Sequence, residues 1–82
     1  MCCEHRPLGD TSTIRVRGRF VFSCQSAFRA ACDKALARAE TRAIHIDLSQ
    51  VEYLDSSALG MLLLLKEKAT PLGKRASWAP AA

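Results

Sequence analysis

The residues of this sequence that could carry chemistry lie in the run Asp55-Ser56-Ser57-Ala58-Leu59, between an extended segment and an apolar helix. A carboxylate and two hydroxyls often begin a helix, because short oxygen-bearing side chains accept hydrogen bonds from the unpaired N–H groups of its first turn. A serine at this place also suits phosphorylation, because a helix N-terminus attracts anions. The run can therefore be interpreted either as a plain helix cap or as a phosphorylation switch.

The elements that position this run follow from the spacing of apolar residues. Apolar and polar residues alternate along 13–22 and 43–49, which is typical of half-buried strands. Between them, small apolar residues recur every three or four positions along 24–39, which indicates an amphipathic helix. Gly18 marks a possible bend or bulge in the first strand, and Ser23 is expected to cap the helix.

A second helix is expected over residues 57–70, ending before Pro71, whose ring clashes with a continuing helix. A third strand is expected over 75–78, and residues 1–12 are expected to form an irregular lead-in. The order strand, helix, strand, helix, strand predicts an α/β fold. Its core is a small mixed, largely parallel β-sheet with helices packed on one face.

The composition fits one globular domain, with 82 residues, 49% hydrophobic and 24% charged. The net charge of +4 belongs to the first 42 residues, which hold eight Arg and Lys against four Asp and Glu. Arg15, Arg17 and Arg19 share one strand face, where they are expected to be solvated or to meet Asp47 or an acidic partner. Few aromatic residues (6%) and no dense basic run argue against nucleic-acid binding.

No apolar run approaches the roughly 20 residues that span a bilayer, and the N-terminus does not look like a secretion signal. The protein is therefore expected in the cytoplasm, with Cys2, Cys3, Cys24 and Cys32 as thiols. Cys32 is expected to pack in its helix as a small hydrophobe. No Cys-x-x-Cys pair accompanies Cys2, Cys3 and His5, so neither a metal nor a cofactor is expected.

A hydrolase could be imagined from His45, Asp47 and Ser56, but no glycine-framed nucleophile turn surrounds the serine. The sequence also contains no glycine-rich phosphate-binding loop and no kinase motif. His45 is expected to be an ordinary strand histidine. The protein is thus not expected to be an enzyme.

The segment from Ile46 to Leu62, Ile-Asp-Leu-Ser-Gln-Val-Glu-Tyr-Leu-Asp-Ser-Ser-Ala-Leu-Gly-Met-Leu, resembles the STAS (sulfate-transporter and anti-sigma-factor-antagonist) domain. The similarity is to its bacterial anti-anti-sigma factor branch, and the earlier strand and helix fit that family too. The resemblance implies a single STAS-like domain over residues 13–82. Family members usually continue through one more helix, strand and helix, which this chain is expected to lack. A homo-oligomer could complete its shortened sheet.

The resemblance also implies a mechanism. In this branch the serine directly after the aspartate is phosphorylated by an anti-sigma factor that is also a serine kinase. The unphosphorylated form binds that anti-sigma factor and frees a sigma factor, and a metal-dependent serine phosphatase resets the switch. The matching acceptor is Ser56, with Ser57 as second choice and as the expected cap. Asp47, Asp55 and Ser57 would form its environment, while Val21 stands where the family tends to have an acidic residue.

The apolar helix 57–70 is expected to supply the docking surface for the partner. Its partner-binding residues are expected to be Ala58, Leu59, Met61 and Leu64. Leu59 is also expected, with Leu62 and Leu63, to point inward and anchor the helix on the sheet. Two alternatives remain open: a constitutive STAS adaptor, for instance in a lipid-transporting ABC complex or a signalling complex, and a truncated remnant without function.

Overall fold

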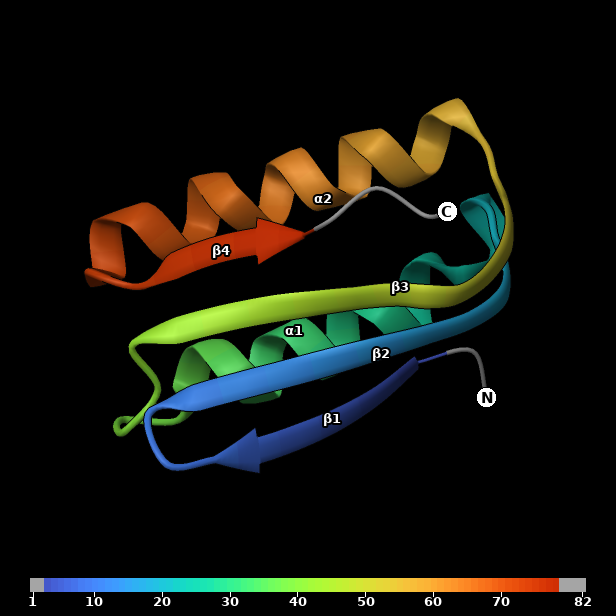
Figure 1. Ribbon diagram of the computed structural model, residues 1–82. Helices are drawn as coiled ribbons and strands as arrows, with labels where there is room; N and C mark the ends of the chain where they lie inside the picture. Colours follow the sequence, from blue (N-terminus) through green and yellow to red (C-terminus); the bar gives the residue numbers. More distant parts are fainter. Residues whose placement is uncertain (1–2, 79–82) are drawn as a thin grey trace.

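A computed structural model of the protein describes residues 3–78 (Figure 1). Strands and helices alternate along most of this range, as the sequence predicts. In chain order the elements are β1 (Cys3–Leu8), β2 (Thr11–Phe20), η1 (Phe22–Cys24), α1 (Gln25–Ala37), β3 (Ala43–Leu54), α2 (Ser56–Ala69), η2 (Thr70–Leu72) and β4 (Arg75–Trp78). Cys2 and the end of the predicted domain, residues 79–82, lie outside the described residues.

The four strands form one sheet in the order β1-β2-β3-β4. β1 is antiparallel to β2, whereas β2, β3 and β4 are mutually parallel. α1 packs on β1 and β2, and α2 packs beside β4 (Figure 1). The predicted fold class, a mixed and largely parallel sheet with helices on one face, is confirmed.

A single hydrophobic core joins the two helices to that face of the sheet. Its centre is a tilted stack of Phe20 and Phe28, whose ring centroids lie 5.1 Å apart. The strands contribute every second residue, as their alternation predicts. The fully or nearly fully buried strand residues are Ile14, Val16, Phe20, Ile44, Ile46 and Leu48.

The N-terminal segment differs from the prediction, because residues 3–8 form the strand β1 and are not irregular. β1 pairs with β2 through a two-residue hairpin loop, Gly9-Asp10, in which Gly9 has a φ of 59°. This turn requires the left-handed conformation that glycine adopts without strain. β1 escapes a search for alternating apolar residues because it is a polar edge strand in which only Cys3 is buried.

β3, which is the strand predicted over residues 43–49, is longer than expected, since it continues past Ser49 to Leu54. The register between β2 and β3 shifts twice, between Arg15 and Arg17 and between Gly18 and Arg19. Gly18, with a φ of 71°, marks the bend that the sequence predicts. Each shift adds one residue to β3 and breaks its two-residue alternation, which is why the second half of the strand was not predicted.

The first helix is shorter than expected and begins differently. A 3-10 turn, η1, precedes it, so α1 starts at Gln25, and Ser23 is not its N-cap. Cys24 is buried at this junction and its thiol donates to the Arg19 carbonyl over 3.2 Å. Cys32 packs in the core as predicted, and burial raises the pKa of its thiol to about 12.

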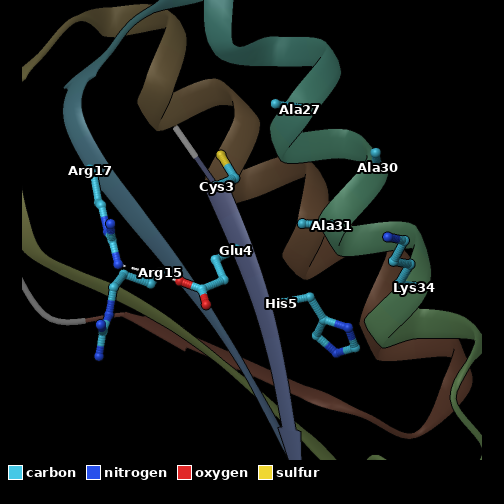
Figure 2. Close-up of a pocket in the computed structure, with 9 residues that line it drawn as sticks. All are labelled: Cys3, Glu4, His5, Arg15, Arg17, Ala27, Ala30, Ala31 and Lys34. Atoms are coloured by element: carbon cyan, nitrogen blue, oxygen red, sulfur yellow. Dashed lines mark hydrogen bonds and ion pairs between the residues drawn. The ribbon is translucent and has the colours of Figure 1, made fainter. Parts of the chain in front are cut away.

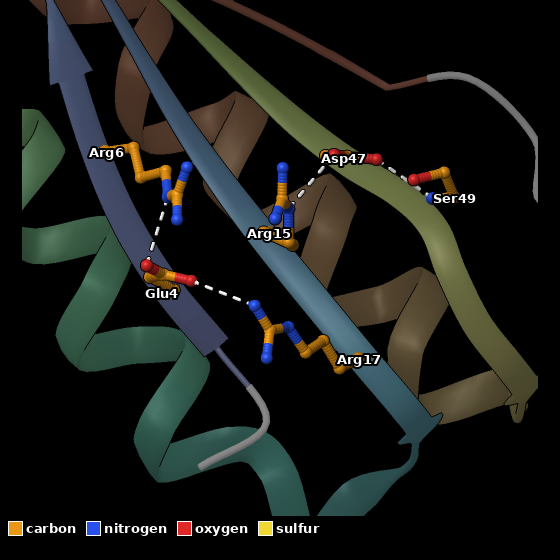
Figure 3. A network of polar contacts seen from close by, with 6 residues as sticks. All are labelled: Glu4, Arg6, Arg15, Arg17, Asp47 and Ser49. Carbon is orange, nitrogen blue, oxygen red and sulfur yellow. Dashed lines mark hydrogen bonds and ion pairs between the residues drawn. The ribbon is translucent and has the colours of Figure 1, made fainter.

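The face of the sheet opposite the helices is polar and rich in arginine (Figure 3). Arg15 lies beside Asp47, with 3.4 Å between Nε and Oδ2, which confirms one of the three expected roles for the arginines. Glu4 bridges Arg6 (3.0 Å) and Arg17 (3.4 Å). These pairs neutralise part of the positive charge, and the two exposed pairs of Glu4 contribute little stability because water screens them.

A chain of hydrogen bonds fastens the β1–β2 hairpin to the loop before β3. The Arg38 guanidinium donates to Thr41 Oγ1 (3.0 Å), and Thr41 Oγ1 lies 2.8 Å from Ser12 Oγ. Ser12 Oγ in turn lies 3.0 Å from Nε2 of His5. Arginine can only donate, so Thr41 Oγ1 accepts from Arg38. Either hydroxyl can donate in the Ser12–Thr41 hydrogen bond, and the Ser12–His5 hydrogen bond runs in the direction that the His5 tautomer sets.

This arrangement predicts that acid weakens the fold through His5. Burial, and then the charges of Lys34 and Arg38, lower the pKa of His5 below 6.5. His5 therefore binds a proton more readily in the unfolded chain than in the folded chain. The free energy of unfolding should consequently fall as pH drops through about 6.5. Urea titrations between pH 8 and 5.5 measure this loss.

The matched control for that titration is His45→Gln, which removes the exposed histidine and should keep the loss, whereas His5→Gln should abolish it. The carboxylates of Glu4 and Asp47 affect stability at a lower pH than His5 does. Glu4 has its pKa lowered from 4.5 by Arg6, and Asp47 from 3.8 by hydrogen bonds from Ser49. Their stabilisation disappears only below those values. Equal pH profiles for the two histidine variants would contradict the role of His5.

Candidate functional site

The junction between β3 and α2 is held by Asp55. Its Oδ1 accepts a hydrogen bond from the Ala58 N–H at 3.0 Å, which makes it the N-cap of α2. Its Oδ2 accepts from the Phe22 N–H at 3.4 Å, and its own N–H donates to the Phe20 carbonyl. One aspartate thus caps the helix and fastens it to the end of β2. The expectation that Ser57 caps α2 is wrong.

Ser56 is the first residue of α2, and its side chain is exposed. Its hydroxyl has no hydrogen-bond partner among residues 3–78, so it is available to another molecule. Ser57, the next residue, is half-buried. Of the two serines, Ser56 is therefore the more accessible acceptor.

Asp47 does not belong to this junction. It lies on β3 seven residues before Leu54, the last residue of that strand. At roughly 3.3 Å per residue, Asp47 is on the order of 20 Å from Ser56. Its carboxylate contacts Arg15 and accepts from the Ser49 N–H at 3.0 Å. It was expected beside the serine because the strand was expected to end at Ser49.

The helix α2 buries one narrow stripe and exposes the rest. The stripe is spaced by three or four residues and consists of Ala58, Leu62, Leu65 and Ala69. Leu59 and Leu63 are half exposed, at 50% and 49%, so the expectation that they point inward is wrong. Leu62 does face the core. Ala58 is fully buried and cannot touch a partner in this structure, contrary to the prediction.

The predicted partner-binding residues therefore divide into two groups. Leu59 and Leu64, each 50% exposed, are open to a partner. Met61 is half-buried against the core. Met61 and Leu64 also line a small cleft between α1 and α2, about 40 Å³, which Arg29 and Lys68 flank with positive charge.

Three exposed apolar residues near the junction were not predicted as part of the site. Phe22 (64% exposed) donates its N–H to Asp55, and Tyr53 (52%) and Leu54 (38%) directly precede it. The Arg19 guanidinium lies 5.0 Å from the centre of the Tyr53 ring, in a cation–π contact. Phe22 was assigned to a strand and Tyr53 to a connection, and nothing in the sequence says that both remain exposed beside Ser56.

Residues 3–78 contain no cluster of three His, Cys, Asp or Glu side chains that could hold a metal ion. Cys2, which the sequence grouped with Cys3 and His5, lies outside that range. Within the same range, neither helix is long and apolar enough to cross a bilayer.

A mixed sheet with two helices on one face, and an Asp-Ser-Ser junction opening the second helix, define a STAS domain. The chain belongs to the family described as Mlab, STAS domain, whose model matches residues 3–78. A STAS-domain containing protein of Pseudomonas aeruginosa (strain UCBPP-PA14) is 44% identical over 61 residues, which cover 74% of this chain and 58% of that protein. The chain thus spans little more than half the length of this relative.

Solved anti-sigma factor antagonists share the fold. Unphosphorylated SpoIIAA has a TM-score of 0.79 at 18% identity, over 98% of this chain and 74% of that one. The Bacillus cell fate determinant SpoIIAA in its phosphorylated form gives 0.73 at 19%, over 90% and 68%. An antagonist from Mycobacterium paratuberculosis gives 0.77 at 24%, over 95% and 67%. At these identities the likeness is one of fold.

The capping role of Asp55 is testable by substitution. Asp55→Ala should lower the free energy of unfolding by about 1 kcal/mol, because the first turn of α2 loses a hydrogen-bond acceptor. Asp55→Asn keeps an acceptor and should cost less. Ser57→Ala is the matched control and should change stability little. Denaturant titration measures all three, and a larger loss in Ser57→Ala than in Asp55→Ala would contradict the assignment.

Proposed function

We propose that this protein is an anti-sigma factor antagonist, switched by phosphorylation at Ser56. The observation that carries the proposal is the exposed hydroxyl of Ser56 at the first position of α2, which has no hydrogen-bond partner within residues 3–78 and lies beside exposed apolar residues. The unphosphorylated protein would bind an anti-sigma factor that is also a serine kinase. A metal-dependent serine phosphatase would reverse the modification.

The shared fold of SpoIIAA, solved in unphosphorylated and phosphorylated forms, supports this proposal without testing it. In this proposal the protein is a kinase substrate and has no catalytic activity. It acts in the cytoplasm, where sigma factors direct transcription.

The electrostatics at Ser56 favour a change in binding over a change in fold. A phosphate adds roughly −1.5 to −2 charges, and the N-terminus of α2 attracts it by only about 0.3–1 kcal/mol at an exposed site. The Asp55 carboxylate, one residue away, repels it. These opposed effects leave the folded structure nearly unchanged, whereas a partner that buries Ser56 would have to desolvate the new charge.

The docking surface would combine the exposed residues around Ser56. Leu59 and Leu64 lie on α2, Phe22 lies in η1, and Tyr53 and Leu54 lie at the end of β3. Exposed apolar groups gathered in this way are typical of a binding surface. A phosphate on Ser56 would stand within this surface, which explains how one modification could release the partner.

The first test is phosphorylation itself. Serine kinases encoded beside the gene, incubated with the protein and ATP, should add one phosphate to Ser56, detected by mass spectrometry. Ser56→Ala should abolish the modification, and Ser57→Ala should retain it because Ser57 is half-buried. Modification of neither serine by a cognate kinase would refute the switch.

The second test measures partner binding. Ser56→Asp should bind the anti-sigma factor at least about tenfold more weakly than Ser56→Ala, because a charge enters a desolvated interface. Equal affinities in calorimetry would contradict the electrostatic account, whatever the kinase result.

The apolar residues provide a third test. Leu59→Ser and Leu64→Ser should each weaken partner binding by about 1–3 kcal/mol, as expected for an apolar residue buried in an interface. Leu72→Ser is the matched control, because Leu72 is 57% exposed but follows the far end of α2. If Leu72→Ser weakened binding as much as the other two, the surface would be misplaced.

A second candidate is a constitutive STAS adaptor of a transporter or signalling complex. It is favoured by the exposure of Leu59, Leu63 and Leu64 in the unmodified chain, which needs no phosphate to be ready for docking. An adaptor would co-purify with a membrane ATPase and not with a kinase. Ser56→Asp and Ser56→Ala would then bind that ATPase equally well.

A further inference from the structure

The outer edge of β1 is open within the described part of the chain. β1 pairs with β2 on one side, and no described strand pairs with its other side. The backbone groups on such an edge can hydrogen-bond an added strand. Pro7 lacks an N–H, so pairing is limited to the part of β1 before it.

A cavity of about 510 Å³ runs beside this edge (Figure 2). Its wall on the helix side consists of Ala27, Ala30 and Ala31 of α1, whose short side chains leave the space unfilled. Figure 2 shows Glu4 on the side of β1 that faces the arginines, and His5 on the side toward α1. The cavity therefore offers room on both sides of the edge, where the alternating side chains of an added strand would lie.

The residues around the cavity carry a positive excess. Arg17 and Lys34 line it beside the single carboxylate of Glu4, and Arg15, which also lines it, is paired with Asp47. Arg17 reaches Glu4 only at 3.4 Å and stays half exposed, and Lys34 is in no ion pair within residues 3–78. An incoming carboxylate could thus pair with Lys34 on the helix side or with Arg17 on the other.

We propose that the outer edge of β1 binds an extended acidic segment of a partner protein, which adds a strand to the sheet beneath the alanine face of α1. Backbone hydrogen bonds would hold the segment, and its side chains would alternate between two environments. Small apolar groups would lie against Ala27 and Ala31. Carboxylates would meet Lys34 and Arg17.

A second copy of this chain fits the edge less well. In a two-fold β1–β1 pair, the α1 helices of both copies would approach over the shared edge, because each packs on its own β1. The second helix would then need the space that the cavity provides. A single extended segment has no such helix.

The test uses the full chain and a display library of random octapeptides. Enriched peptides should carry net negative charge and should slow hydrogen exchange of the β1 amides from Glu4 to Arg6, as measured by NMR. The proposal would be overturned if no peptide were enriched, if enriched peptides were neutral or basic, or if they protected α2 instead. Dimerisation of the chain through β1 in solution would also overturn it.

Variants locate the contact. Ala30→Leu fills the cavity without adding charge and should abolish peptide binding, whereas Ala37→Leu, on an exposed position of the same helix, should leave it unchanged. Lys34→Glu should weaken binding about fivefold, as expected for an exposed ion pair at an interface rim. Lys68→Glu, on α2, should not. Equal binding by Ala30→Leu and Ala37→Leu would exclude the cavity.

This surface is independent of Ser56, which lies at the start of α2, across β2 and β3 from the open edge. Ser56→Asp should therefore leave the selected peptides bound with unchanged affinity. Failure of the phosphorylation tests would leave the β1 proposal standing, and the reverse also holds.

Discussion

The structure depends on one hydrophobic layer between a single face of the sheet and two helices. Ile14, Ile44 and Ile46 are completely buried in it, and the Phe20–Phe28 stack joins the sheet to α1. A chain of this size buries only about 60% of the surface that it exposes when unfolded, so one layer is as much core as it can form. The opposite face of the sheet and the outer sides of both helices must then remain at the surface.

The outer face of the sheet and the outer side of α2 differ in the kind of side chain that they expose. On the open face of the sheet, arginines and carboxylates pair across strands, as Arg15 does with Asp47, so this face remains hydrated (Figure 3). On α2 three of the exposed residues are leucines, Leu59, Leu63 and Leu64, whose side chains cannot form such pairs. Exposed leucines contribute nothing to the core, which is the physical reason to associate this side of α2 with a partner.

The Asp55 carboxylate connects the core to that surface. By accepting from both Ala58 and Phe22, it fixes the start of α2 against the end of β2, and the position of Ser56 follows. The Ser56 hydroxyl itself has no hydrogen-bond partner within residues 3–78, so Asp55 and not the serine holds this junction.

The sequence by itself determined the elements whose cause is local. Alternation predicted β2 and the first half of β3, alanine spacing predicted α1, and Pro71 predicted the end of α2 near Ala69. The Asp-Ser-Ser run predicted a helix start and the family. Only the tertiary structure decided that β1 is a strand, that bulges extend β3 and remove Asp47 from the site, and which leucines face outward. Strand pairing and burial depend on residues distant in sequence, so the local pattern of a leucine-rich helix or a polar edge strand does not specify them.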